Sequence, residues 1–357
     1  MNLELYQILI EFLQENTPTK LTPKKLLKLV FTVILIVCGG LFFEYIPSLL
    51  TTIPYLRSLK PVDYEILASG QKPIEIVLSF EYNLSSKKDN LWIEYLKGSI
   101  VAAQANSVEL RLRQGDWQTF EDRIKRALQN HPKGIILNTL EGLSEETIQQ
   151  LQEFNNVVVG DNPQTIFKSV RTDEFRLGVL VTQDLKQIQP LIKEAVILTG
   201  IPKTRNNDLR VSGLTKGLQI AKIPLKATLA AWWRAEDAYN RTSEIIRNYP
   251  NVNLIVCAND EMSFGVLDAL RDLGVDQQIF ITNFDFVPHT EELISQDLIL
   301  ASVDTQSYKR GSLSVRSLLL NTSREDIFIT PLMDKAITKQ NLAAYLTIQK
   351  AVNQVDN

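Results

Sequence analysis

Short apolar runs alternate with amphipathic stretches from about residue 72 to the C-terminal region of the chain. The clearest example begins with residues 254–258 (LIVCA), an apolar run of the kind that a strand buried on both faces needs. Asn259 and Asp260 break the run, and apolar residues then recur at helical spacing from Met262 onward. Gly274 is typical of a residue that ends a helix. This stretch therefore predicts a buried strand, a polar turn and a helix.

The same unit recurs along the chain. We expect strands at residues 74–80, 108–112, 134–138, 156–160, 195–199, 227–231, 279–283 and 300–303. We expect helices at residues 90–106, 117–129, 174–185, 208–220, 238–248, 288–295 and 307–320, with another opening at residue 144. Alternating strands and helices predict parallel sheets built from βαβ units. The units fall into two α/β halves, followed by irregular strands up to residue 339.

The N-terminal region has a different character. Residues 29–43 (LVFTVILIVCGGLFF) carry no charge, and four lysines lie just before them. Extended to residue 46, this run approaches the length of a tilted membrane-spanning helix, and the lysines favour a cytoplasmic N-terminus. We therefore expect a cytoplasmic segment at 1–28, a transmembrane anchor at 29–46 and a linker at 47–71. A cleaved signal peptide is the alternative, but no small-residue cleavage site follows Phe43.

Composition excludes several classes of function. The 357-residue chain has 45% hydrophobic and 22% charged residues and a net charge of −3, with no basic block after residue 90. A nucleic-acid partner is therefore not expected. With two cysteines and two histidines, no metal site or cofactor is expected either. No nucleophile–base motif is visible, so we do not expect an enzyme.

Four segments carry a family resemblance. They are residues 210–218 (RVSGLTKGL), 256–274 (VCANDEMSFGVLDALRDLG), 281–288 (ITNFDFVP) and 329–342 (ITPLMDKAITKQNL). In their order and spacing they resemble the type I periplasmic binding protein family, in particular its sugar-binding branch of ribose- and galactose-binding proteins. The resemblance covers about residues 72–342.

The resemblance implies an α/β fold of two doubly wound parallel-sheet lobes joined by a three-strand hinge, here preceded by one N-terminal transmembrane helix. The first lobe would comprise residues 72–173 and about 306–335, and the second residues 174–305 and about 336–350. The crossing strands would fall near residues 171–174, 283–288 and 301–306. The ligand would lie between the lobes.

The resemblance also implies a set of ligand-binding residues. In the second lobe they are Arg210, Trp233, Asn259 and Asp285; in the first lobe they are Asp89, Trp92, Asp161 and Asn162; at the hinge they are Thr305 and Gln306. Two positions depart from the family pattern. Asn162 stands where the family often has arginine, and Thr305 aligns with the hinge glutamine, with Gln306 next to it.

These residue types suit a sugar. Carboxylates, amides and an arginine can bond the hydroxyl groups around a sugar ring, and tryptophans can pack against its apolar faces. Simpler interpretations exist for single positions. Asn259 and Asp260 could be only a helix cap, and Trp232 and Trp233 could be core or interface residues. Within the pair Asn259–Asp260, we expect Asn259 to contact the ligand and Asp260, with Glu261, to serve the helix start.

We therefore expect a membrane-anchored, extracytoplasmic solute-binding protein that delivers a small polar ligand, a sugar, to an ABC permease. The alternative is a ligand-binding sensor that reports to a membrane receptor such as a histidine kinase. Sugar-responsive repressors share this fold, but the apolar run at residues 29–43 stands where they carry a helix-turn-helix.

Overall fold

The computed structural model describes residues 64–66, 72–80, 91–161, 166–275, 278–320 and 326–355. The expected cytoplasmic segment and anchor, Asp89 and Asn162 lie outside these residues. Within the described ranges, no helix combines the length and apolar character that crossing a membrane requires. The chain divides into two compact units, 1–60 and 61–357, and every described residue belongs to the second unit.

The first lobe contains a five-stranded sheet. Its elements in chain order are β1 (Tyr64–Ile66), β2 (Ile74–Val77), α4 (Leu91–Ala105), β3 (Leu110–Arg113), the 3₁₀ helix η2 (Trp117–Thr119), α5 (Phe120–Gln129), β4 (Gly134–Thr139), α6 (Glu145–Phe154) and β5 (Val157–Asp161). The strand order is β1-β3-β2-β4-β5. All neighbouring pairs are parallel except β1 and β3. The sheet thus starts before residue 72, because β1 lies in the stretch expected as a linker.

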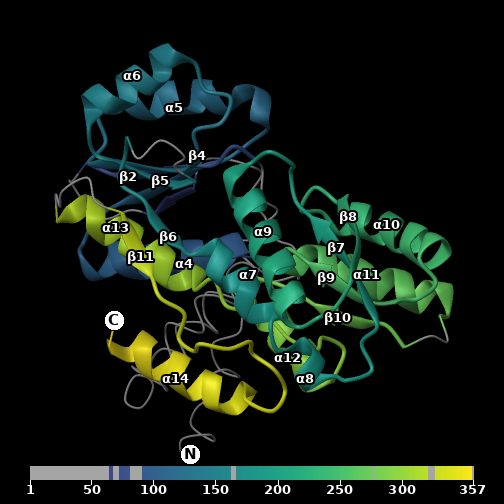
Figure 1. Ribbon diagram of the computed structural model, residues 1–357. Helices are drawn as coiled ribbons and strands as arrows, with labels where there is room; N and C mark the ends of the chain where they lie inside the picture. The colour runs from purple at the N-terminus through teal and green to yellow at the C-terminus, as the bar shows by residue number, and fades with distance from the viewer. Residues whose placement is uncertain are drawn as a thin grey trace, which may run out of the picture. The chain divides into compact units, whose positions relative to one another are not determined.

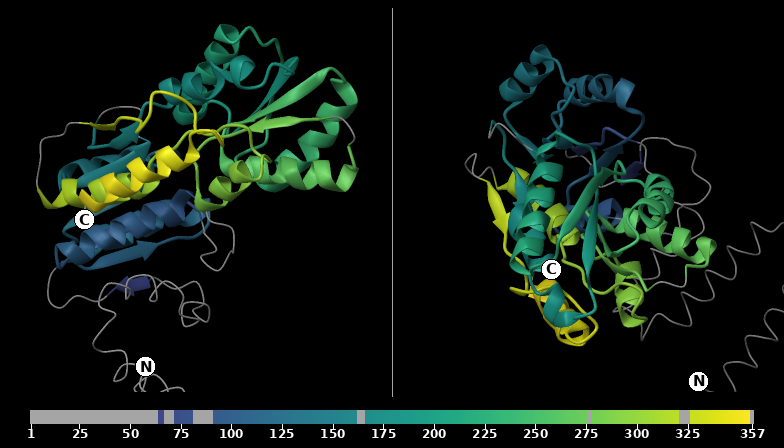
Figure 2. Two further views of the ribbon diagram at one scale, coloured as in Figure 1. Left: turned by 90° about the horizontal axis from the view of Figure 1, so that it is seen from below. Right: turned by 45° about the vertical axis from the view of Figure 1, so that its right-hand side comes forward.

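Both faces of this sheet are covered by helices. Ile76 of β2 packs into a cluster with residues of α4 and α13 (Ser307–Leu319), whereas its neighbour Val77 packs with residues of α5 and α6. Alternate side chains of a strand point to opposite faces, so this division is what a doubly wound sheet requires. Figure 1 shows α5 and α6 on one side of the sheet and α4 and α13 on the other. The helices α4 and α13 lie side by side although they are far apart in the sequence (Figure 2).

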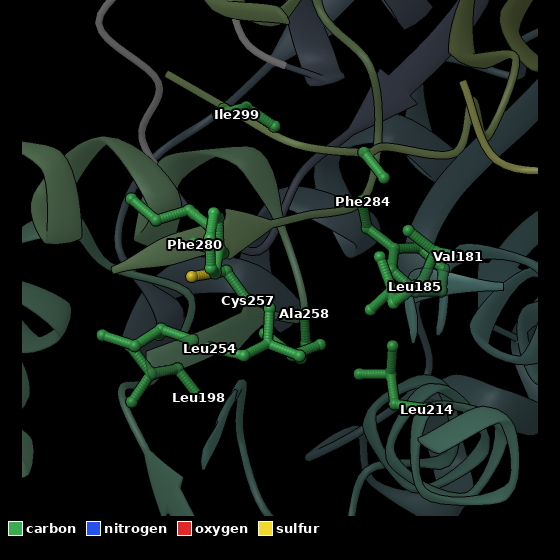
Figure 3. Close-up of a cluster of buried hydrophobic side chains, with 14 of the residues drawn as sticks. Val181, Leu185, Leu198, Leu214, Leu254, Cys257, Ala258, Phe280, Phe284 and Ile299 are labelled. Atoms are coloured by element: carbon green, nitrogen blue, oxygen red, sulfur yellow. The ribbon is translucent and has the colours of Figure 1, made fainter. Parts of the chain in front are cut away.

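The second lobe contains a four-stranded parallel sheet of order β10-β9-β7-β8. Its elements are α7 (Glu174–Thr182), α8 (Leu185–Ile188), β7 (Glu194–Thr199), α9 (Arg205–Ile220), β8 (Leu225–Ala230), α10 (Ala235–Asn248), β9 (Val252–Cys257), α11 (Asp260–Leu273), β10 (Phe280–Thr282) and α12 (Pro288–Ser295). Figure 3 shows Leu198, Leu254 and Cys257 of the sheet in one apolar cluster with Phe284 and Val181. The expected parallel α/β architecture is confirmed in both lobes.

The chain passes between the lobes at three places. The first lies between β6 (Val170–Thr172) and α7, since Val170 packs in the first lobe and Leu177 in the second. The second lies between Asp304 and α13, and the third follows β11 (Ile327–Ile329). β6 and β11 pair in parallel as a separate two-stranded sheet.

The prediction that the chain crosses between the lobes at residues 283–288 is wrong. Phe284, Phe286 and Val287 all pack in the apolar cluster of the second lobe, and so does Leu293 of the helix that follows. The chain therefore stays in the second lobe there. The 283–288 segment is instead a neighbour of a true crossing, because Asp285 pairs with Asp304 in a parallel β-bridge.

The chain ends in a helix that we did not predict. α14 (Leu342–Val355) follows the region where only irregular strands were expected. Leu342 and Tyr345 pack in the apolar cluster of the second lobe, with the ring of Tyr345 edge-on to Phe286 at a centroid distance of 5.1 Å.

Candidate functional site

Arg210 is the centre of a buried polar cluster in the second lobe. It lies in the second turn of α9, and only 6% of its surface is exposed. Its Nε donates to Glu174 Oε2 at 2.6 Å, and its Nη2 is 3.2 Å from Asp285 Oδ1. Its Nη1 donates to the carbonyl oxygen of Ala258 at 2.7 Å. The guanidinium thus ties together the ends of three segments: the first crossing, β9 and β10.

Burial and charge act against each other in this cluster. Burial opposes the charge on Arg210, but Asp285 and Glu174 outweigh it and raise the pKa of Arg210 above its ordinary value. Burial also raises the pKa of Asp285, although Arg210 opposes that shift. Two buried carboxylates therefore share the guanidinium of Arg210, and the buried Arg310 also lowers the pKa of Asp285.

Two aromatic rings flank the guanidinium. Its central carbon lies 4.7 Å from the ring centroid of Phe284 and 5.4 Å from that of Trp233. Trp233 is half-buried and follows β8 with a left-handed φ of 65°. Gly200, after β7, makes room for it, because a Cβ at that position would lie 1.7 Å from the indole. The indole is thus fixed beside Arg210 at the carboxyl end of the sheet.

Asn259 is both a helix cap and a neighbour of this cluster. Its Oδ1 accepts from Met262 N at 2.9 Å, so it caps α11. Its Nδ2 donates to the carbonyl oxygen of Trp233 at 3.2 Å. The capping interpretation is therefore correct for Asn259, and the same side chain also holds the Trp233 turn.

We had expected Asp260 to serve the start of its own helix, but its carboxylate makes its hydrogen bonds elsewhere. Its carboxylate accepts from Val287 N at 2.8 Å, from Thr290 Oγ1 at 2.6 Å and from Asn283 Nδ2 at 2.5 Å. It therefore fixes the start of α12 and the loop that carries Asp285. Burial and the neighbouring Asp285 raise the pKa of Asp260 well above its ordinary value.

Both hinge residues of the predicted set are buried. Thr305 Oγ1 donates to Asp285 Oδ1 at 3.4 Å. Gln306 has a left-handed φ of 51°, and its Nε2 donates to the carbonyl oxygen of Thr330 at 2.7 Å. Gln306 thus joins the second and third crossings. Asp285 is thus in contact with both Arg210 and Thr305, and Gln306 follows Thr305 in the chain.

A cavity of about 140 Å³ lies between the lobes next to the crossings. Asp285 and Gln306 line it from the predicted set, and Leu91 and Glu94 of α4 line it from the first lobe. Its other walls come from the starts of α12 and α13 and from α14. Arg210, Trp233 and Asn259 do not line this cavity, so the predicted residues of the second lobe extend beyond it.

The first-lobe part of the predicted set is less fully described. Trp92 lies in α4, half-buried against Phe80 and Tyr95 at centroid distances of 5.4 Å each. Asp161 is the last residue of β5. Asp89 and Asn162 lie outside the described residues. The two ring contacts of Trp92 are with residues of the first lobe.

Other first-lobe residues organise the carboxyl end of the sheet and were missed. Ser79, after β2, and Asn138, in β4, exchange two hydrogen bonds of 2.8 Å. Arg123 of α5 donates to the carbonyl oxygens of Leu78 and Asp116 at 2.9 Å each, and so holds together the loops after β2 and β3. Ser79 could have been predicted as a site residue, because it is a polar residue that directly follows an apolar run.

Glu174 was also missed in the second lobe. It stands at the first position of α7, where an acidic residue is common because it favours the positive end of a helix. Because that ordinary role explains the residue, we did not predict its contact with Arg210, 36 residues later in the chain. Its position in an expected crossing strand was the available signal.

Comparison with solved structures shows the same fold. A periplasmic solute-binding protein of Actinobacillus succinogenes, solved with bound D-allose, superposes with a TM-score of 0.68 at 20% identity, over 77% of this chain and 100% of that one. A carbohydrate transporter solute-binding protein of Agrobacterium radiobacter, in complex with D-arabinose, gives 0.67 at 16% identity, over 79% and 99%. The two-lobed fold implied by the resemblance is confirmed.

Sequence comparison gives shorter matches. The D-allose-binding periplasmic protein of Escherichia coli is 26% identical over 111 residues, which are 31% of this chain and 36% of that protein. The lactose operon repressor of Klebsiella pneumoniae is 24% identical over 176 residues, 48% of this chain and 49% of the repressor. The chain therefore matches about a third to a half of the length of these curated relatives.

A family model described as "Periplasmic binding protein domain" matches residues 81–323. That range includes Arg210, Asn259, Asp285 and both predicted hinge residues. With the solute-binding relatives, it confirms the resemblance read from the sequence. The chain belongs to the periplasmic binding protein family.

Proposed function

We propose that this protein binds a neutral sugar between its two lobes and delivers it to an ABC permease. One observation carries the sugar assignment: the buried contact of Arg210 with both Glu174 and Asp285 at the carboxyl end of the second-lobe sheet. Ligands of open α/β sheets bind beyond the carboxyl ends of the strands. The cluster offers both charged acceptors and charged donors there, as hydroxyl groups require.

The charge of the cluster favours a neutral ligand over an acidic one. Arg210 is already paired with two carboxylates, so it is not free to serve as the counter-ion of a carboxylate or phosphate on the ligand. A hydroxyl group can donate to Asp285 and accept from an N–H without a change in net charge. Trp233 offers an aromatic face for the apolar side of a sugar ring. Relatives solved with D-allose and D-arabinose support this ligand class.

We propose further that Asp89, Trp92, Asp161 and Asn162 face the ligand from the first lobe, opposite Arg210, Trp233, Asn259, Asp285, Thr305 and Gln306. The first lobe would comprise β1 with residues 72–173 and about 306–329, and the second lobe residues 174–305 and about 330–355. Closure would follow from contacts that one ligand makes to both lobes. The proposed anchor at residues 29–46 would hold the lobes at the outer face of the membrane.

A ligand screen tests the sugar assignment. Purified full-length protein is titrated with D-allose, D-ribose, D-arabinose, D-glucose and D-galactose, and with D-glucuronate and amino acids as acidic or zwitterionic controls. We expect a neutral sugar to raise the melting temperature, since a ligand at 100 times its Kd adds about 2.7 kcal/mol of stability. A response to the controls alone would contradict the proposal.

Delivery to a permease is tested separately. The full-length chain is isolated from membranes of its own cells after mild crosslinking, and its partners are identified by mass spectrometry. We expect an ABC permease among them. A complex with a receptor kinase and no permease would contradict the transport role while leaving sugar binding intact.

A further inference from the structure

The C-terminal helix α14 reaches the cavity between the lobes. Gln349 and Asn353 of α14 line that cavity together with Leu91 and Glu94 of α4. α14 lies beyond residue 323, where the match to the family model ends. The helix therefore lines the same cavity as Asp285 and Gln306 of the proposed binding site, without being part of the matched domain.

α14 also holds one residue of the second crossing. Tyr345 Oη and Gln349 Nε2 both donate to Asp304 Oδ2, the second of these at 3.1 Å. Tyr345 itself is held in place, because it is almost fully buried and packs against Phe286. Two donors from one helix thus fix a carboxylate that belongs to a strand between the lobes.

Asp304 in turn fixes Gln306. The other oxygen of Asp304 accepts from Gln306 N at 2.6 Å. Gln306 has a left-handed φ of 51°, a conformation that a residue with a side chain keeps only when its surroundings impose it. The bond from Asp304 supplies such a constraint. Gln306 lines the cavity, so its placement depends on a carboxylate that α14 orients.

Asp304 is also connected to Asp285. The two residues form a parallel β-bridge, and Asp285 N donates to the carbonyl oxygen of Val303 at 3.0 Å. A shift of Asp304 would therefore move the backbone that carries Asp285 as well as that of Gln306. Both are residues of the proposed ligand site.

We propose that α14 is a working part of the binding site: Tyr345 and Gln349 are positioning residues that act through Asp304, and the amides of Gln349 and Asn353 form a wall of the cavity. This rests on the proposed function, because the ligand meant is the sugar. The side-chain amides offer both donors and acceptors to hydroxyl groups that extend toward α14.

The test compares affinity with stability in matched variants of the full-length protein. Tyr345→Phe removes one donor to Asp304, and Gln349→Met removes the other with little change of shape. Lys350→Leu, on the exposed side of α14, is the control. The Kd is measured by titration calorimetry with whichever of D-allose, D-ribose, D-arabinose, D-glucose and D-galactose the wild type binds most tightly.

We expect each of the two variants to raise Kd about tenfold, while the melting temperature falls by no more than a few degrees and the control changes neither. If Tyr345 acts through Asp304, Tyr345→Phe adds little further loss in an Asp304→Asn background, whereas Gln349→Met keeps the part of its loss that comes from the cavity wall. A Kd within twofold of wild type in both variants would overturn the proposal and leave α14 a purely structural element. A wild type that binds none of the five sugars would instead overturn the proposed function, and this inference with it.

Discussion

Arg210 Nε of α9 lies 2.6 Å from Glu174 Oε2 at the start of α7, and both residues are almost fully buried. Glu174 lies where the chain first enters the second lobe. Its contact with Arg210 therefore joins this first crossing to the carboxyl end of the sheet in that lobe. With Asp285 also paired to the guanidinium, we expect the proposed ligand site and the local stability of the lobe to depend on the same three side chains.

Truncation of Arg210 is expected to cost stability as well as ligand binding. Arg210→Ala leaves Glu174 and Asp285 as buried carboxylates without their cation, which should lower the free energy of unfolding by about 3–5 kcal/mol. Urea denaturation of the full-length protein measures this. Arg210→Met combined with Glu174→Gln and Asp285→Asn should recover most of the loss, because it leaves no unpaired charge. A cost below about 1 kcal/mol for Arg210→Ala would show that the pairing is weak.

Asp260 is expected to be a stabilising residue and not a ligand contact. Asp260→Ala leaves Val287 N, Thr290 Oγ1 and Asn283 Nδ2 without their shared acceptor, and each loss of a buried partner costs about 1–3 kcal/mol. The matched control is Asp272→Ala, an exposed carboxylate on the same helix, which should stay within about 0.5 kcal/mol of wild type. Equal effects of the two substitutions in chemical denaturation would contradict this role.

Gly200 is expected to matter through Trp233. A Cβ at residue 200 would lie 1.7 Å from the indole, so Gly200→Ala must displace the ring from its place beside Arg210. If the ring packs against the ligand, sugar affinity should fall by about tenfold or more, as for Trp233→Ala. Titration calorimetry compares the two variants. Full affinity in Gly200→Ala with lost affinity in Trp233→Ala would place the indole elsewhere.

The raised pKa of Asp304 leads us to expect that this residue makes the protein less stable as the pH rises. Burial is the main cause that raises the pKa of Asp304 from its ordinary value of 3.8 to about 6. Between these two values the folded protein binds the proton more tightly than the unfolded chain. The stabilisation by the protonated carboxyl of Asp304 is therefore fully present below pH 4 and is lost as the pH rises through 6, by about 3 kcal/mol.

The check is a comparison of wild type with Asp304→Asn, which cannot titrate. The difference in their free energies of unfolding should change between pH 4 and pH 7, in the direction that penalises wild type at the higher pH. A difference that does not vary over this range would show that Asp304 titrates normally. Differences between the two proteins are used because other carboxylates titrate in the same interval.

Periodicity predicted the repeating elements of both lobes because each one has a local signal. The strand at Val252–Cys257 is buried at every position, and the helix after it ends at Gly274 with a left-handed φ of 57°, as the sequence indicated. The error at residues 283–288 has a different origin. A segment that crosses between lobes and one that lies beside such a crossing have the same local pattern, and only the packing of Phe284 separates them.

The candidate site was predictable where the residue type carried the signal. Arg210 and Asp285 were expected from the resemblance, and their contact is present. Glu174 was missed although it lies in an expected crossing strand. The contact of Asp260 with Thr290 could not be predicted, because an acidic residue at a helix start already has an ordinary explanation. α14 was missed although Leu342, Tyr345 and Leu346 share a helical face, a signal that was present in the sequence.

The most direct measurement of the central claim is calorimetric titration of the full-length protein and its Asp285→Asn variant with the five neutral sugars and with D-glucuronate. The substitution keeps the shape of the side chain and removes one charged acceptor beside Arg210. We predict that a neutral sugar binds the wild type at micromolar Kd or tighter, that D-glucuronate does not bind, and that Asp285→Asn weakens the sugar at least a hundredfold. Binding of D-glucuronate alone, or equal sugar affinity in both proteins, would contradict the account.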